Sequence, residues 1–142
     1  MQEAVTLLKK NNLKITPQRI AIIQYLSNHH THPTAEEVYE NLKQKNPSLS
    51  KTTVYNTLDT LTKAGILYRL TICPTEHRYD INTTMHHHFI CKKCRQIYDI
   101  DFQCPNVEKI SKKVQNKGHQ IEEIHGYFKG ICKKCLQKRG GD

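Results

Sequence analysis

The 142-residue chain has no tryptophan, and only 7% of its residues are aromatic. Aromatic side chains contribute some of the largest buried areas in proteins, so we do not expect a large hydrophobic core. Small domains with thin cores need additional stabilisation from a metal ion, a disulfide or a partner chain. The length suits one compact domain or two very small ones.

Long apolar runs are also absent. No stretch approaches the roughly 18 consecutive apolar residues that a membrane helix needs. Lys9, Lys10 and Lys14 interrupt the apolar residues near the N-terminus, so no segment resembles a secretory signal peptide. We therefore expect a cytoplasmic protein without a membrane partner.

Basic residues outnumber acidic ones. The chain has 22 lysines and arginines against 13 acidic residues, which gives a net charge of +9. Such an excess favours polyanionic partners such as DNA, RNA or an acidic membrane surface. The composition, with 37% hydrophobic and 25% charged residues, is polar for a globular chain but is not that of a disordered one.

Four of the six cysteines form two pairs, each with a gap of two residues: Cys91 with Cys94, and Cys132 with Cys135. The cytosol keeps thiols reduced, so disulfides are not expected. Four thiolates from two tight turns suit tetrahedral Zn²⁺, and we predict a structural zinc site. The alternatives are buried thiols or two redox motifs, which require a cysteine pair between a strand and a helix, a context we expect for neither pair. Cys73 and Cys104 have no partner at this spacing, and we interpret both as ordinary thiols.

Residues 1–65 carry helical signals. Thr16, Thr34 and Ser50 are N-cap residues, and Thr34 forms a capping box with Glu37. Apolar residues at helical spacing follow each cap, and Gly65 ends the third of these helices. Two strands are expected at 66–72 and 77–81. Three helices before a hairpin is the order of a winged helix-turn-helix, with 34–45 and 51–64 as its helix pair.

The pattern changes after residue 80. Strands are expected at 86–92 and 96–102 around the first cysteine pair, then a helix from Pro105 to Gly118, and strands at 119–125 and 127–131. The predicted fold class is therefore α+β. A winged-helix DNA-binding domain, 1–79, precedes a small α/β domain, 80–142, that carries the four-cysteine zinc site. The thin core favours a partner chain.

The helix after Ser50 begins with polar residues, as recognition helices do. We expect Lys51, Thr52 and Thr53 to bind phosphate oxygens, and Tyr55 and Asn56 to reach base edges. The alternative is an ordinary solvated helix face. The preceding helices and the hairpin favour the DNA-binding interpretation.

A second set of candidate metal ligands surrounds the string 86–88. His86 and His88 share one face of the predicted strand, and two imidazoles on one face can bind one ion. Asp80 lies between the two halves, and Asp99 lies on a strand that can pair with 86–91. A mixed nitrogen and oxygen set suits Fe²⁺, Mn²⁺ or Zn²⁺. The residues alone do not single out His32.

Other histidines have weaker claims. His29, His30, His77 and His119 are interpreted as surface residues. An additional weak metal site formed by His87, Glu108 and His125 is left open.

The chain resembles the Fur family of metal-responsive repressors over nearly its whole length. The motifs that carry the resemblance are Thr16-Pro17-Gln18-Arg19, His32-Pro33-Thr34-Ala35, Thr53-Val54-Tyr55, Tyr79-Asp80, His86-His87-His88, Cys91-x-x-Cys94 and Cys132-x-x-Cys135. The family implies a homodimer whose C-terminal domain dimerises, an AT-rich inverted-repeat operator and structural zinc in the four cysteines. Its regulatory metal site falls on His32, Asp80, His86, His88 and Asp99. Tyr55 matches the recognition-helix tyrosine, and we add Arg19 to the expected DNA contacts.

Asp99 makes the chain look more like the peroxide-sensing PerR branch, since the iron-uptake branch usually has glutamate there. The chain departs from some members of the family at Ile124, where an additional site uses a histidine eight positions before the third cysteine. That departure puts the additional site in doubt.

The resemblance predicts a mechanism. A cation held by ligands from both halves would fix the angle between them, and hence the spacing of two recognition helices in a dimer. Fe²⁺ in that site would react with peroxide and oxidise His32 or His86, which releases the metal and the DNA, whereas Mn²⁺ would resist this chemistry. Peroxide and the metal ion are the only small molecules expected to act on the protein.

Three other functions compete with peroxide sensing. The first is an iron-, zinc- or manganese-responsive repressor that measures occupancy only. The second is a non-haem iron enzyme, which would leave the winged helix without a role, so we do not expect an enzyme. The third is a zinc-ribbon binding module without regulation.

Overall fold

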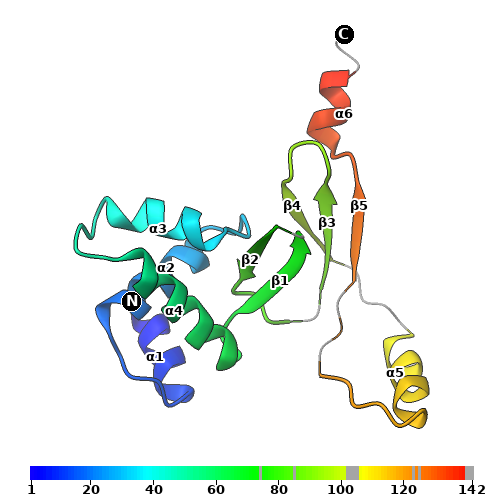
Figure 1. The fold of residues 1–142 in the computed structure, drawn as a ribbon, viewed down its shortest axis with the longest axis horizontal. Coiled ribbons are helices and arrows are strands. Elements are labelled where there is room, and N and C mark those ends of the chain that lie inside the picture. Colours follow the sequence, from blue (N-terminus) through cyan, green and yellow to red (C-terminus); the bar gives the residue numbers. More distant parts are fainter. Residues whose placement is uncertain (74, 85, 102–105, 123, 125, 140–142) are drawn as a thin grey trace. The chain divides into compact units, whose positions relative to one another are not determined.

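The computed structural model describes residues 1–73, 75–84, 86–101, 106–122, 124 and 126–139. The chain divides into two compact units, Met1–Thr84 and Met85–Asp142. The first unit contains four helices and a hairpin, and the second contains strands and two helices. Figure 1 labels these elements. Among the described residues, no helix has the length and apolar character needed to cross a membrane.

The four helices of the first unit are α1 (Gln2–Lys10), α2 (Pro17–Asn28), α3 (Ala35–Lys43) and α4 (Lys51–Lys63). Three of them begin where the sequence predicts. The Thr16 hydroxyl accepts from the Arg19 amide, and the Ser50 hydroxyl accepts from the Thr53 amide. Thr34 and Glu37 form the predicted capping box. These side-chain bonds satisfy amides at the helix starts that have no partner within the helix.

The hairpin of the first unit consists of β1 (Tyr68–Cys73) and β2 (Glu76–Asp80). The strands are antiparallel, with Arg69 opposite Tyr79 and Tyr68 opposite Asp80. The element order, three helices and a hairpin after α1, is that of a winged helix-turn-helix. α3 and α4 are the predicted helix pair.

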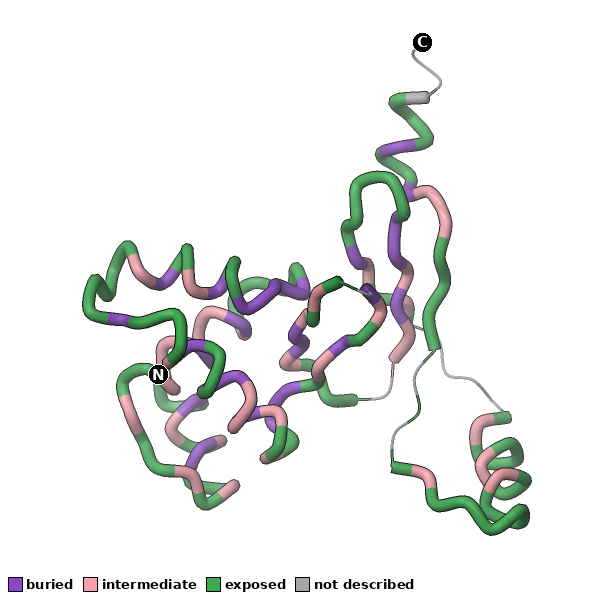
Figure 2. The backbone as a smooth tube through the Cα atoms, in the orientation of Figure 1, coloured by how far each residue is buried: buried purple, intermediate pink, exposed green. Residues whose placement is uncertain are grey.

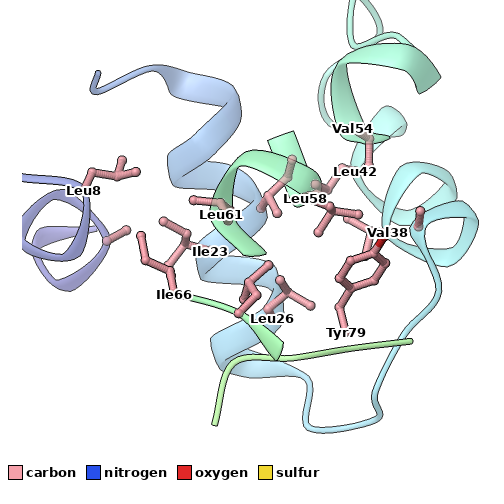
Figure 3. Close-up of a cluster of buried hydrophobic side chains, with 14 of the residues drawn as sticks. Leu8, Ile23, Leu26, Val38, Leu42, Val54, Leu58, Leu61, Ile66 and Tyr79 are labelled. Atoms are coloured by element: carbon pink, nitrogen blue, oxygen red, sulfur yellow. The ribbon is translucent and has the colours of Figure 1, made fainter. Parts of the chain in front are cut away.

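The core of the first unit draws apolar side chains from all four helices and the hairpin. Leu8, Ile22, Val38, Val54 and Leu58 are fully buried. Figure 3 shows this cluster, with the ring of Tyr79 reaching into it from β2. The side chains that face this core recur at helical spacing, which is why the sequence pattern located the helices.

The second unit contains a three-stranded sheet of β3 (His87–Cys91), β4 (Ile97–Ile100) and β5 (Tyr127–Gly130) in the order β4-β3-β5. β3 pairs antiparallel with β4 and parallel with β5. Helix α5 (Val107–Asn116) lies between β4 and β5 in the chain, and α6 (Lys133–Arg139) follows β5. None of the residues of α5 is buried (Figure 2).

Two predictions for the second unit were wrong. No strand forms at the described residues of 119–125, where no side chain is buried, so neither face of such a strand would pack against a core. The second cysteine pair was predicted as a turn after a strand, whereas α6 begins directly after Cys132. Cys132 and Cys135 are therefore one helical turn apart, a spacing that places both sulfurs on one side.

Candidate metal centres and DNA-binding face

The four paired cysteines converge in the second unit. Cys91 ends β3, Cys94 lies in the turn that follows, and Cys132 and Cys135 lie at the start of α6. The sulfurs of Cys91 and Cys135 are 3.8 Å apart, and those of Cys94 and Cys132 are 3.7 Å apart. A tetrahedron with Zn–S bonds of about 2.3 Å has edges of about 3.8 Å. The four sulfurs therefore fit a structural zinc ion.

The surroundings of the cysteines favour thiolates. Burial raises the pKa of the Cys91 thiol, but the backbone amides of Cys94 and Cys132, at 3.5 and 3.3 Å, donate to its sulfur and bring the pKa to about 6. Burial and the neighbouring sulfurs raise the pKa of Cys135 to about 12. A dication is therefore needed to hold all four as thiolates at neutral pH.

His86, His88 and Asp99 form a cluster in the second unit. Their atoms meet because β3 pairs with β4, which places Asp99 directly opposite His88. The Asp99 carboxylate oxygen Oδ1 lies 3.2 Å from Nε2 of His86 and 3.4 Å from Nε2 of His88. The two imidazole rings have centroids 4.4 Å apart, as predicted for residues that share a face. Two nitrogens and one oxygen form a site for a borderline or hard divalent metal.

His32 and Asp80 form a pair in the first unit. Nε2 of His32 lies 3.3 Å from Oδ2 of Asp80, and both side chains are buried. The other oxygen of Asp80 accepts from the backbone amide of Asn82 at 2.9 Å. A buried imidazole and carboxylate in contact are also candidate metal ligands.

The backbone around His32 is held in an unusual conformation. His32 has a φ of 53°, in the left-handed region that non-glycine residues rarely occupy. Arg78 donates from Nη1 to the His32 carbonyl at 3.3 Å, and the Tyr79 amide donates to the Pro33 carbonyl at 3.0 Å. These bonds from β2 support a strained residue at a functional site.

The role of Arg78 in this support was missed by the sequence analysis. Arg78 and Thr34 are partners in a β-bridge that joins the loop of His32 to β2. Nothing in the local pattern of the strand marks an arginine as a partner of a residue 46 positions earlier. Only tertiary pairing brings the two segments together.

The predicted recognition helix is α4, whose outer face is accessible. Lys51, Thr52, Tyr55 and Asn56 are exposed, and Thr53 is half-buried. The buried residues of α4 are Val54, Thr57, Leu58 and Leu61. Exposed and buried positions therefore divide along the helix as expected for one face in the core and one available to DNA.

Two predicted DNA contacts already have partners within the protein. The Lys51 ammonium lies 3.1 Å from Oε1 of Glu36 on α3, and the pair is exposed. Arg19 donates to the carbonyl of Lys14 at 2.7 Å. Exposed ion pairs are weak, so Lys51 can exchange its carboxylate for a phosphate at little cost.

A groove of about 640 Å³ opens between α4 and the hairpin. Tyr55, Asn56 and Asp59 line it from α4, and Arg69 and Tyr79 line it from the strands. The remaining lining residues come from the start of α3 and from residues 75–77. The groove therefore separates α4 from the β1–β2 hairpin, the wing of the winged helix, and its lining is largely polar.

Comparison with known proteins identifies the family. The model of the ferric uptake regulator family matches residues 10–128. This chain belongs to the ferric uptake regulator (Fur) family. The Fur fold confirms the predicted α+β class, and members of the family are metal-responsive DNA-binding regulators.

Individual Fur-family relatives agree with this assignment. The peroxide-responsive repressor PerR of Staphylococcus aureus (strain Mu50) is 38% identical over 97% of this chain and 93% of its own length. The structure of the Campylobacter jejuni peroxide stress regulator has a TM-score of 0.69 at 32% identity, covering 92% of this chain and 98% of that one. Helicobacter pylori Fur, in which three functional metal-binding sites are described, has a TM-score of 0.71 at 28% identity, covering 95% and 90%.

The remaining predicted residues are distributed as follows. Cys73 is buried in β1 and lies outside the four-cysteine cluster. Cys104 and His125 lie outside the described residues, so the additional site with His87 and Glu108 stays an open prediction. The four-cysteine cluster and the His and Asp groups give this Fur-family chain the donor sets for structural zinc and for a regulatory metal.

Proposed function

We propose that the chain is a peroxide-responsive repressor that acts in the cytoplasm as a homodimer on an AT-rich inverted-repeat operator. The observation that carries this proposal is the Asp99 carboxylate, which lies against both His86 and His88. An aspartate at this position, and similarity to a peroxide-responsive repressor at 38% identity, both favour the peroxide-sensing branch.

The structural zinc is assigned to Cys91, Cys94, Cys132 and Cys135. The regulatory metal, Fe²⁺ or Mn²⁺, is assigned to His32, Asp80, His86, His88 and Asp99. The support is that the first unit already pairs His32 with Asp80, and the second already groups the other three. Each unit thus supplies a partial coordination set, and neither offers more than three of the five ligands.

DNA binding is assigned to α4 and its surroundings. Lys51, Thr52 and Thr53 would bind phosphate oxygens, with Arg19 at the start of α2. Tyr55 and Asn56 would reach base edges, and the exposed tyrosine ring, at 46% accessibility, is available to a thymine methyl group. In a dimer, two such helices must be spaced to enter successive major grooves about 34–36 Å apart.

Metal binding and DNA binding are coupled through the two units. When His32 and Asp80 share one cation with His86, His88 and Asp99, the ligands fix the orientation of one unit against the other. Only one orientation gives the spacing that the operator requires. The regulatory metal is then an allosteric ligand, because it binds the DNA-competent state more tightly than the other.

Peroxide sensing depends on which side chains lie at the metal. Ferrous iron, when bound, supplies the electrons that reduce hydrogen peroxide to a strong oxidant. The imidazoles of His32 and His86 are the groups expected to gain an oxygen atom, and an oxidised imidazole is a poorer ligand. Loss of a ligand lets the two units separate and releases DNA. The four zinc-bound thiolates keep their structural role.

The test is peroxide treatment of zinc-intact protein loaded with Fe²⁺ or with Mn²⁺, followed by peptide mass spectrometry. We expect an added oxygen on the peptide containing His32 or on that containing His86, with iron only. Operator binding should be lost in the same samples. Oxygen on the cysteines instead, or no oxygen on either histidine peptide, would contradict the proposal.

Asp99→Glu is the matched variant, because it keeps the carboxylate and adds one methylene. In a peroxide sensor we expect this variant to keep metal-dependent operator binding but to gain much less oxygen. If Asp99→Glu changes neither property, and low doses of peroxide do not release DNA, the protein measures metal occupancy only. That result would place it with the iron-, zinc- or manganese-responsive regulators.

A further inference from the structure

An ion pair joins the recognition helix to the hairpin. The Arg69 guanidinium, on β1, donates from Nη2 to Oδ1 of Asp59, on α4, at 2.8 Å. The second carboxylate oxygen of Asp59 lies 2.9 Å from the Lys63 ammonium. Asp59 is therefore held on one side by its own helix and on the other by the wing. Contacts with Lys63 and Arg69 lower the pKa of the Asp59 carboxyl, so it stays charged near neutral pH.

Arg69 also lies against Tyr79. The two residues are directly opposite each other in the antiparallel β1–β2 pair, so their side chains share one face of the hairpin. Both residues also line the groove between α4 and the hairpin. The Tyr79 ring is 5% exposed and is embedded in the core (Figure 3).

Tyr79 is linked to both members of the His32–Asp80 pair. Asp80 is the next residue along β2, and the Tyr79 amide donates to the carbonyl of Pro33, the residue after His32. The hydrogen bond from Tyr79 to Pro33 therefore joins the residue before Asp80 to the residue after His32. We therefore expect ordering of His32 and Asp80 to restrain the position of Tyr79.

We propose that Arg69 is a positioning residue that ties α4 to β1, the partner of the strand that carries Asp80, so that ordering of the His32–Asp80 pair orients the recognition helix. This inference rests on the proposed metal-dependent repressor function. Part of the coupling between metal binding and DNA binding then lies within the first unit. It passes from Asp80 through Tyr79 and Arg69 to Asp59.

The location of Asp59 on α4 gives the link a consequence for DNA binding. Asp59 is three residues after Asn56 and four after Tyr55, so all three lie on neighbouring positions of one helix face. The same three residues line the groove beside the hairpin. We therefore expect a change in the Asp59–Arg69 contact to alter how α4 presents Tyr55 and Asn56.

The Asp59–Arg69 pair differs from the surface pair of Lys43 with Glu40. Lys43 and Glu40 are 2.9 Å apart, but both belong to α3, and they join no second element. Arg69 is less exposed, at 32% against 43% for Lys43. A planar guanidinium also holds a carboxylate in a more defined geometry than an ammonium does. The Lys43–Glu40 pair is thus the natural control.

The experiment measures operator affinity of the full-length, zinc-intact protein with saturating Mn²⁺ and after removal of Mn²⁺ by a mild chelator. The ratio of the two affinities is the readout. We expect Arg69→Gln and Asp59→Asn each to lower this ratio by about fivefold, a typical size for allosteric coupling. The reversed pair, Asp59→Arg with Arg69→Asp, should recover the ratio in part, since Lys63 opposes the reversed charge.

The control replaces Glu40 and Lys43 together by glutamine and should leave the ratio unchanged. A merely structural role for Arg69 would weaken binding equally with and without Mn²⁺, and an unchanged ratio in Arg69→Gln would overturn the inference. If the wild-type ratio is well above one and the variants keep it, this inference alone fails. A wild-type ratio of one would overturn the proposed function, and the inference with it.

Discussion

The first unit buries apolar side chains from every helix and from the hairpin, whereas the buried cluster around the metal donors of the second consists of three cysteines. Phe89, Tyr98 and Ile131 pack only partly buried against those cysteines. Several large apolar side chains of the second unit are exposed, including Ile110, Tyr127 and Phe128. The larger first unit is thus stabilised by a hydrophobic core, and the smaller second unit has its buried cluster at the cysteines.

The difference predicts which unit depends on a ligand. Hydrophobic burial stabilises the first unit without any cofactor. In the second unit we expect the metal ion to supply the main stabilisation. It joins the four sulfurs and so closes the long loop between the two cysteine pairs. Substitutions in each unit should therefore have separable effects.

Cys135→Ser tests this comparison with the largest expected effect. Structural zinc contributes on the order of 10–16 kcal/mol in small domains, so we expect loss of zinc and unfolding of the second unit. The first unit should keep its helices. Zinc content and amide hydrogen exchange, resolved by unit, measure both outcomes.

Cys73→Ala is the matched control for Cys135→Ser, because Cys73 is buried in β1 but lies outside the cluster. It should retain one zinc per chain. A Cys135→Ser protein that keeps its zinc and a protected second unit would show that the cysteine cluster is not what stabilises that unit.

Leu58→Ala tests the first unit. Leu58 is fully buried in α4, and removing a buried leucine leaves a cavity that costs about 2–5 kcal/mol. Denaturant unfolding should show this loss in the first unit, with zinc content unchanged. Ile15→Ala, at a residue that is 41% exposed, should stay within about 0.5 kcal/mol of the wild type. Equal effects of the two substitutions would contradict the assignment of the core.

Ser50→Ala has the smallest expected effect. The Ser50 hydroxyl accepts from the Thr53 amide at 3.1 Å at the start of α4. Loss of this cap should lower the free energy of unfolding by about 1 kcal/mol, while Ser50→Gly should cost only a few tenths. Thermal unfolding of the wild type and the two variants measures these losses, and a melting temperature of Ser50→Ala equal to that of the wild type would show that the hydroxyl does not stabilise the helix.

The helices of the first unit could be predicted because local signals and the core agree. Thr16, Thr34 and Ser50 cap the helices they were expected to cap. Most of the apolar residues that follow them are buried, whereas Ile20 and Tyr39 are only partly buried. Helix signals of this kind are local, so they can be recognised in the sequence without knowledge of the tertiary fold.

The second unit was harder to predict because its strands pair over long distances. The parallel pairing of β3 with β5 joins segments that are far apart in the sequence, and no local signal marks it. The helix after Cys132 was not predicted, because the two lysines between Cys132 and Cys135 also suit a turn. The metal donors could be predicted in part. Cysteine spacing located four ligands, and strand alternation located His86 and His88, whereas His32 needed the family resemblance and Arg78 was missed.

The measurement that tests the account most directly is a titration of operator binding with zinc-intact dimers. Mn²⁺ is added to one sample, Fe²⁺ to another and Fe²⁺ with peroxide to a third. We predict tight binding with either metal alone, and weak binding after peroxide treatment of the iron form or after removal of the regulatory metal. If dimers that retain zinc but lack the regulatory metal bind the operator with full affinity, the central claim is contradicted.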